Sequence, residues 1–236
     1  MNKLQSQFQR LYCSDESDLT EGPLIDRHGQ VRALVVELAR PADWEALSIL
    51  WRGVQADLDL CAPAIAVSGS DGLQLWFSLV EPVSIDLARA FLQSLCTRYL
   101  PDVAASRLRL MPADGAQCVP ALHERSGYWS AFVTAELAPL FADTPWIDSQ
   151  PSSDGQAGVL SRLLSITPPA FSAALRQLGL DTAVTEASAL TTRTELVAEP
   201  ARYADAKRFL QQIMNDDSVA LALRIEAAKA LLPYQN

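Results

Sequence analysis

The chain has 236 residues, 49% of them hydrophobic, which is enough to bury a core in one large domain or two small ones. Its formal net charge of −9 excludes a protein that coats DNA throughout, because binding to phosphate backbones relies on clustered lysine and arginine. No apolar run reaches the roughly 18 residues of a membrane span. The first residues also lack the apolar core of a signal peptide, so we expect a cytoplasmic protein without membrane contact.

The cysteines indicate reduced thiols rather than a metal site or a disulfide framework. Cys13, Cys61, Cys96 and Cys118 form no Cys-x-x-Cys pair. His123 follows Cys118 by five residues, but a metal centre needs more ligands than these two. We therefore expect neither a metal ion nor another cofactor.

The chain begins with an irregular segment, which a strand and a helix follow. Residues 1–30 are polar and predict an N-terminal arm; the alternative is a short helix that docks through Leu4, Phe8, Leu11 and Tyr12. Residues 31–38 are apolar and rich in β-branched side chains, which predicts a buried strand. Asp43 then offers an N-cap to a helix whose apolar residues fall at helical spacing.

A β-hairpin is the clearest local pattern. Residues 64–79 hold two apolar runs with alternating side chains, and SGSDG between them is turn chemistry. Pro82 and Ser84 open a second helix, which Pro101 ends. Strands are predicted at 108–111 and 128–134. This order predicts an α+β domain over 31–145, with a mixed sheet and helices on one face.

The remainder of the chain reads as helical. Polar and breaking residues predict a linker at 146–158, and 159–236 is expected to be an all-helical region. One helix begins at Pro168 and is capped at Gly179. Residues 181–198 fit a helix or a coil, and two amphipathic segments at about 203–233 predict an αα-hairpin.

Two segments of the predicted sheet carry residues suited to nucleotides. A nucleotidyl transferase needs carboxylates that hold Mg²⁺ against triphosphate oxygens. Glu37 stands near the end of the first strand, whereas Ala39 on the same face cannot ligate a metal. Ser68 and the amides around Gly69 and Gly72 are candidates for a phosphate cradle. The alternatives are a solvated acid at a strand end and a plain tight turn.

Residues 31–135 resemble the core of the archaeo-eukaryotic primase–polymerase superfamily. The family pattern is a strand with Asp-x-Asp, then Ser-Gly-x-x-Gly-x-His-x-Trp, then a helix and a third carboxylate. The match is best over 64–92, where Ser68, Gly69, Gly72 and Trp76 fit, followed by Glu81-Pro82.

This resemblance also implies that the reacting positions are altered. The family's histidine, which contacts the incoming nucleotide, is Gln74 here, and the Asp-x-Asp pair falls on Glu37 and Ala39. Asp114 is the one residue found for the third carboxylate. We expect a vestigial site without catalysis, in which Glu37, Gln74 and Asp114 remain. The alternative is a divergent nucleotidyl transferase that uses Mg²⁺ or Mn²⁺ through Glu37, Asp114 and Asp71.

A binding surface is predicted beside the hairpin. If its arginines converge, single-stranded nucleic acid can lie there, with Trp76 or Trp129 as a stacking platform. The candidate binding residues for a nucleotide or nucleic acid are Ser68, Gly69, Gly72, Gln74, Trp76, Arg107, Arg109 and Arg125.

The tail resembles a helical hairpin of phage-encoded proteins, including some terminase small subunits. The residues that fit are Arg224, Ala227, Ala228, Lys229, Pro233 and Tyr234. The alternative is a plain packing hairpin with a surface arginine. Together the two resemblances imply a protein of a phage, plasmid or integrated element.

The leading hypothesis is a non-catalytic, primase-like accessory protein of DNA replication. It would bind single-stranded nucleic acid, a nucleotide, or a replication or phage protein. The divergent nucleotidyl transferase is the first alternative. The second is an interaction scaffold that oligomerises through its helical tail.

Overall fold

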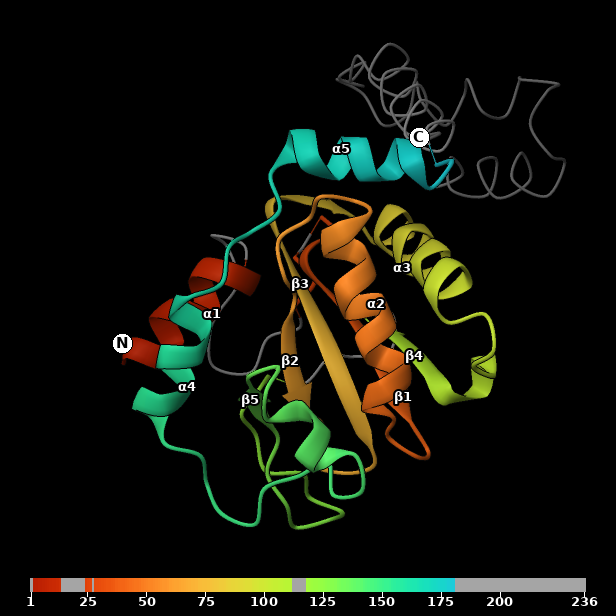
Figure 1. Cartoon of the computed structure of the whole chain (residues 1–236). Helices are drawn as coiled ribbons and strands as arrows, with labels where there is room; N and C mark the ends of the chain where they lie inside the picture. Colours follow the sequence, from red (N-terminus) through yellow and green to blue (C-terminus); the bar gives the residue numbers. More distant parts are fainter. Residues whose placement is uncertain (1, 14–23, 27, 112–117, 181–236) are drawn as a thin grey trace, which may run out of the picture. The chain divides into compact units, whose positions relative to one another are not determined.

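A five-stranded sheet lies at the centre of the computed structural model of the chain (Figure 1). Its strand order is β4-β1-β3-β2-β5, and every pairing of neighbouring strands is antiparallel. The strands are β1 Gln30–Ala39, β2 Ala64–Val67, β3 Gly72–Ser84, β4 Leu108–Met111 and β5 Ala131–Val133.

The structure describes residues 2–13, 24–26, 28–111 and 118–180. These belong to the first of two units, Met1–Val184, and the second unit is Thr185–Asn236. The segment 181–198 and the αα-hairpin predicted at about 203–233 lie outside the described residues.

Two helices connect the strands in a way that interleaves them. α2, Trp44–Ala56, leads from β1 to β2, and α3, Ile85–Tyr99, leads from β3 to β4. Because β3 lies between β1 and β2, and β1 lies between β3 and β4, each crossover passes over one strand. Two interleaved crossovers of this kind form the split β-α-β arrangement of ferredoxin-like folds, to which β5 adds an edge.

The predicted α+β class is confirmed, but the sheet is antiparallel rather than mixed. The two strands of each crossover run in the same direction, yet an antiparallel strand separates them. Local predictions also match: Asp43 caps α2 by accepting a hydrogen bond from the Ala46 amide at 3.0 Å, and Ser84 caps α3. Helix α5 occupies Pro168–Gln177, and Gly179 after it has a positive φ of 72°.

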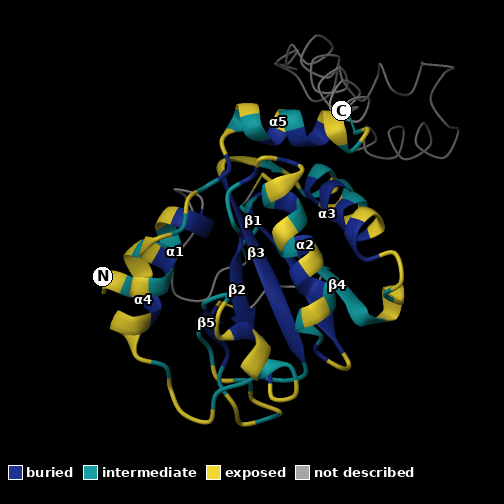
Figure 2. Cartoon of the chain, in the orientation of Figure 1, coloured by how far each residue is buried: buried dark blue, intermediate teal, exposed yellow. Residues whose placement is uncertain are grey.

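Helices cover both faces of the sheet, not one as predicted. Alternate residues of β1 explain this, because Leu34, Val36 and Leu38 pack with α2, α3 and α5, whereas Ala33 and Val35 face α1 and α4. The strands at the centre are therefore buried on both sides (Figure 2). The remaining helices are α1 Lys3–Tyr12, α4 Ser153–Ser161 and the short 3₁₀ helices η1 Ala105–Arg107 and η2 Ala138–Phe141.

The N-terminal helix belongs to the core rather than to an arm. Phe8, Leu11 and Tyr12 are buried on α1. The Arg32 side chain donates to the carbonyls of Cys13 at 2.7 Å and Arg10 at 3.1 Å, which ties the end of the helix to β1. The alternative of a short helix docked through Phe8, Leu11 and Tyr12 is therefore confirmed, whereas its tie to β1 joins segments too far apart in sequence to be predicted.

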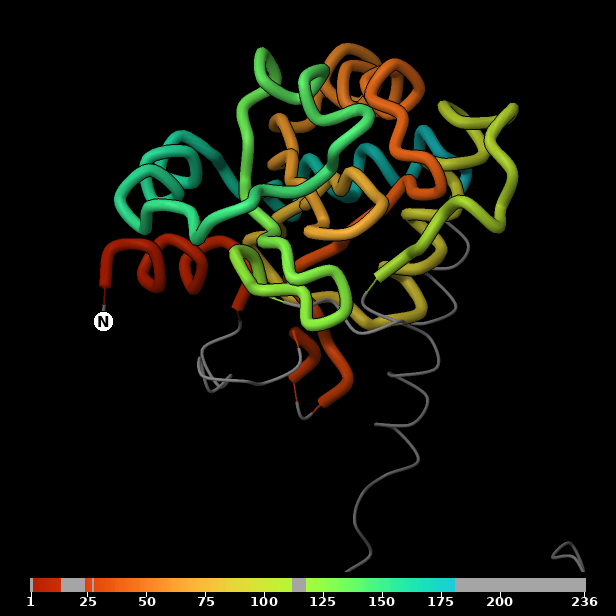
Figure 3. Tube along the Cα trace, turned by 90° about the horizontal axis from the view of Figure 1, so that it is seen from below, coloured from red at the N-terminus to blue at the C-terminus, as the bar shows by residue number. Residues whose placement is uncertain are grey.

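Helix α4 occupies part of the predicted linker and packs beside α1 (Figures 1 and 3). Ser152 caps it, and the buried Gln156 amide pairs with both backbone groups of Phe132: the Phe132 N–H donates to Oε1 at 2.7 Å, and Nε2 donates to the Phe132 carbonyl at 3.0 Å. Gln156 thereby satisfies the open edge of β5 as a further strand would. Within the predicted linker, Ser152 is thus a helix cap and Gln156 is a contact to the edge of β5.

Close packing of α2 on α3 depends on Gly53. A Cβ atom at Gly53 would lie 2.6 Å from Cδ1 of Tyr99. The Tyr99 hydroxyl donates to the Gly53 carbonyl at 3.3 Å and to Asp57 at 3.1 Å, which holds the ring in place. Burial, followed by the hydrogen bond to Asp57, raises the pKa of Tyr99 to about 12.

We predict that Gly53→Ala lowers the free energy of unfolding by about 1–3 kcal/mol, because the new methyl group must displace the Tyr99 ring. The matched control is Gly158→Ala on α4, where a Cβ would meet no atom within 4 Å. The free energy of unfolding of this control should rise by about 0.5–1 kcal/mol, because alanine has a higher helix propensity than glycine. Urea denaturation followed by circular dichroism measures both, and equal stabilisation by the two variants would contradict the close contact.

Candidate functional site

Three strands bring the predicted site residues together at one end of the sheet. In the β1–β3 register Glu37 lies opposite Gln74 and Ala39 lies opposite Gly72. β4 adds Arg109 opposite Glu37 on the other side. Glu37 and Gln74 share the sheet face on which Trp76 packs against α1, because side chains two residues apart on a strand point the same way.

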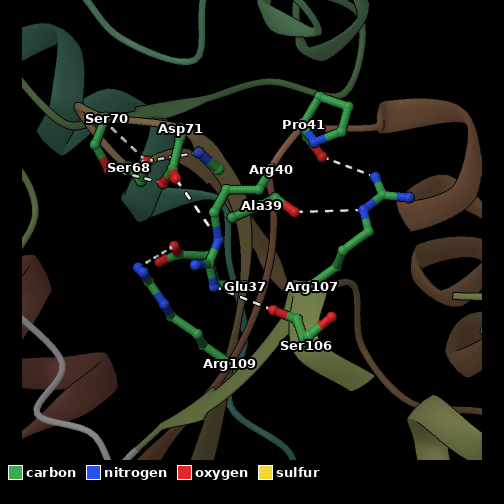
Figure 4. Close-up of polar contacts among 11 residues, drawn as sticks. Glu37, Ala39, Arg40, Pro41, Ser68, Ser70, Asp71, Ser106, Arg107 and Arg109 are labelled. Atoms are coloured by element: carbon green, nitrogen blue, oxygen red, sulfur yellow. Dashed lines mark hydrogen bonds and ion pairs between the residues drawn. The ribbon is translucent and has the colours of Figure 1, made fainter. Parts of the chain in front are cut away.

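The Glu37 carboxylate is buried, and each of its oxygens accepts a hydrogen bond. Residue Glu37 is 4% exposed. Its Oε1 accepts from Nη1 of Arg109 at 3.0 Å (Figure 4). Its Oε2 accepts from Nε2 of Gln74 at 2.7 Å. The Trp76 indole N–H donates to Oε1 of Gln74 at 2.8 Å, which extends the network into the core. The alternative of a solvated acid at a strand end is therefore wrong.

Arg109 supplies the positive charge that the buried carboxylate requires. Its side chain is 43% exposed, against 5% for Glu37, so the pair leads from solvent into the sheet. A buried carboxylate without a partner is costly, and an ion pair with further hydrogen bonds offsets that cost. The position that suggested a metal ligand thus holds an internal ion pair.

The two turn glycines have steric roles. A Cβ atom at Gly72 would lie 2.9 Å from Cγ and Oε1 of Glu37 and 3.0 Å from Cβ of Ala39. Gly69 has a φ of +79°, and a Cβ there would lie 2.9 Å from the Ser130 amide nitrogen. Close packing against β1 and the loop before β5 therefore explains both glycines.

The turn between β2 and β3 uses its amides internally. The Ser68 hydroxyl accepts from the amides of Ser70 at 3.1 Å and Gly72 at 3.0 Å, and the Gly69 amide donates to the Pro145 carbonyl at 3.1 Å. This is the local side-chain-to-backbone bonding typical of serine turns. These three amides are not free to cradle a phosphate, contrary to the expectation for the turn.

Trp76 is not a stacking platform, because it is 1% exposed. It packs in an aromatic cluster with Phe8, Tyr12 and Phe132, at ring-centroid distances of 6.0, 5.2 and 5.7 Å. Trp129 is partly buried, and its backbone pairs with Ile147.

The aromatic pair of this region is instead Tyr128, which is exposed, and Trp146, which is partly buried. Their rings stack with centroids 5.0 Å apart and planes at 15°. The sequence placed Tyr128 and Trp146 in separate segments, and only the pairing of Trp129 with Ile147 brings them together. No local pattern in the sequence predicted this contact.

Most of the predicted basic face is engaged with acids or carbonyls (Figure 4). Arg107 donates to the Pro41 carbonyl at 2.8 Å and lies 3.8 Å from Asp43. Arg40, which the sequence did not suggest, has a positive φ of 55° and lies 3.9 Å from the Asp71 carboxylate. Arg40, Arg107 and Arg109 therefore each lie beside a carboxylate. The three carboxylates are those of Asp71, Asp43 and Glu37, respectively.

Two further candidates do not join this cluster through any described contact. Arg125 is exposed on the loop before β5, where the neighbouring Ser126 hydroxyl donates to the Gly69 carbonyl at 2.6 Å. Asp114 lies outside the described residues.

Fold and site together define a ferredoxin-like α+β protein with an arginine–glutamate pair at the end of its central strands. No model of a known protein family matches the chain, and a search of curated proteins finds no match to it. Within the described part of the chain, no three His, Cys, Asp or Glu residues are grouped so that they could hold a metal ion. Among the same residues, no helix has the length and apolar character to cross a membrane.

We predict that Arg109→Met lowers the free energy of unfolding by about 1–3 kcal/mol, because it leaves the Glu37 carboxylate buried with one neutral donor. Glu37→Gln in the same chain should restore part of this loss, giving a coupling energy of about 1–2 kcal/mol in a double-mutant cycle. Urea denaturation of the four proteins measures it.

The matched control is Arg89→Met on the exposed face of α3. Arg89 has no hydrogen bond or ion pair within the described structure, so its loss should change stability by less than about 0.5 kcal/mol. Strictly additive effects of the Arg109 and Glu37 substitutions would show that the pair contributes nothing to stability.

Proposed function

We propose that the chain is a non-catalytic, primase-like accessory protein of a phage, plasmid or integrated element. In this role it binds single-stranded nucleic acid or a protein of the replication machinery. One observation carries the proposal: Arg109 and Gln74 occupy the carboxylate of Glu37, the residue that the primase–polymerase resemblance aligns with a metal ligand.

The side chains present argue against metal-dependent nucleotidyl transfer. Such chemistry needs carboxylates with open coordination positions facing the phosphates. Glu37 would have to release Arg109 before it could bind a cation, and Ala39 has no ligating atom. Gln74 stands in place of the family's histidine, and its amide is committed to Glu37 and Trp76.

The surface next to this pair supports weak rather than tight binding of nucleic acid. The side chains of Arg40 and Arg109 are 56% and 43% exposed, so phosphate oxygens can reach them. Each phosphate contact would, however, compete with a carboxylate already present, Asp71 or Glu37. Binding through these arginines is therefore expected to be weak and to fall steeply with salt.

We predict that a fluorescent single-stranded oligonucleotide binds at low salt and is released at moderate salt. Arg40→Gln should weaken this binding severalfold, because it removes an exposed phosphate donor, whereas Arg89→Gln on α3 should not. Fluorescence anisotropy at two salt concentrations measures both effects. Absence of binding at either concentration would assign the accessory role to a protein partner alone.

The catalytic alternative has its own test. The full chain, incubated with a primed template, labelled nucleotides and Mg²⁺ or Mn²⁺, should incorporate no nucleotide. Incorporation that Glu37→Gln abolishes would overturn the non-catalytic proposal and identify a nucleotidyl transferase. Incorporation that survives Glu37→Gln would indicate a contaminating polymerase, since the catalytic alternative requires Glu37 as a metal ligand.

A further inference from the structure

A cleft of about 450 Å³ opens where β2 and β5 separate. The ladder between these strands ends at the pair Ile65 and Val133. Residues 62–64 and 134–136, beyond that pair, line the cleft from two sides, and residues of α4 line it from a third. Cavities of about 300–1,000 Å³ are the usual size of small-molecule sites.

The walls of the cleft are mainly apolar. Ile65 and Val133 are buried residues of the two strands, and Val159 and Leu163 line the cleft from α4 and its end. The Trp51 side chain on α2 forms another wall, and its indole N–H donates to the Pro63 carbonyl at 3.1 Å. That hydrogen bond fixes the orientation of the ring, so the cleft has one preformed aromatic surface.

Two glycines on α4 keep the cleft open. A Cβ atom at Gly158 would meet nothing within 4 Å, and one at Gly155 would come no closer than 3.7 Å to Ser152. Neither glycine is therefore required by packing, although glycine within a helix costs about 0.5–1 kcal/mol relative to alanine. Both glycines line the cleft, so a larger side chain at either position would take up part of its volume.

The cleft has one positively charged group at its boundary. Arg162 is exposed at the end of α4 and has no hydrogen bond or ion pair within 4.0 Å among the described residues. Glu136 is its acidic neighbour. Thr134 and the backbone amide of Glu136 lower the pKa of the Glu136 carboxyl, and the Arg162 charge adds a smaller contribution. Local hydrogen bonds thus hold Glu136 and leave Arg162 available.

We propose that this cleft binds a small amphiphilic molecule with an apolar, ring-containing body and an anionic end. The body packs on Trp51 and between the two strands and α4, and the anionic end accepts hydrogen bonds from Arg162. The cleft is hollow and apolar inside and carries a positive charge at its boundary. These features suit a small anionic amphiphile better than the flat surface of a partner protein. The site is independent of the proposed nucleic-acid role, because it shares no residue with the Glu37 network.

The probe for this site is anilinonaphthalene sulfonate, which combines an aromatic body with an anionic group. Titration of the full chain should show one saturable site, with energy transfer from tryptophan to the probe. Gly158→Leu should weaken binding at least about tenfold, because its side chain fills the cleft. Ser161→Leu, which adds the same side chain to α4 outside the cleft lining, should leave the affinity unchanged.

A second variant tests the charged end separately. Arg162→Gln should lower the affinity for the sulfonate probe about tenfold, as expected for loss of a charged hydrogen bond. The affinity for uncharged phenylnaphthylamine should stay the same. Absence of saturable binding, or equal affinities of Gly158→Leu and Ser161→Leu, would overturn the proposal. Circular dichroism checks that each variant is folded, and Gly158→Ala offers a smaller obstruction that should weaken binding less.

Discussion

The buried carboxylate of Glu37 constrains the whole end of the sheet at which it lies. It requires a cation from β4, a neutral donor from β3 and a glycine where β3 begins, and Arg109, Gln74 and Gly72 meet these requirements. Side chains alternate along a strand, so a slip of one residue would turn Glu37 into the apolar core under α2 and α3. The polar network therefore specifies the pairing of β4, β1 and β3, and not only the chemistry of a site.

The same network links the site to the N-terminal helix. Gln74 accepts from the Trp76 indole, and that ring packs against Phe8 and Tyr12 of α1. The face of the sheet that carries Glu37 is thus closed at its other end by aromatic side chains. The two crossover helices, α2 and α3, lie on the opposite face of the sheet and leave this face open. Here α1 and α4 cover much of it. Of the two described residues that bond the Glu37 carboxylate, Arg109 is the one that reaches solvent, with 43% of its side chain exposed, whereas Gln74 is buried.

The sequence predicted what depends on neighbouring residues and missed what depends on distant ones. Caps at Asp43 and Ser84 and the hairpin turn follow from local hydrogen bonding, so their helices and strands match closely. The partner of Glu37 lies on another strand, and nothing in the residues around Arg109 marks it as a counter-ion. The predicted linker at 146–158 was misread for the same reason, since its polar residues gave no sign that Gln156 would bond the backbone of β5.

These contacts change what the Ser-Gly-x-x-Gly pattern implies. In the resembled family the pattern accompanies nucleotide chemistry, but here Ser68, Gly69 and Gly72 serve the turn and its packing against β1. The packing around Gly69 and Gly72 requires glycine whether or not the segment takes part in a reaction. Glu37 depends on Arg109, because losing the arginine would leave a carboxylate inside the sheet without its counter-ion. The pattern is therefore evidence about the strand pairing first, and it bears on ancestry only through that pairing.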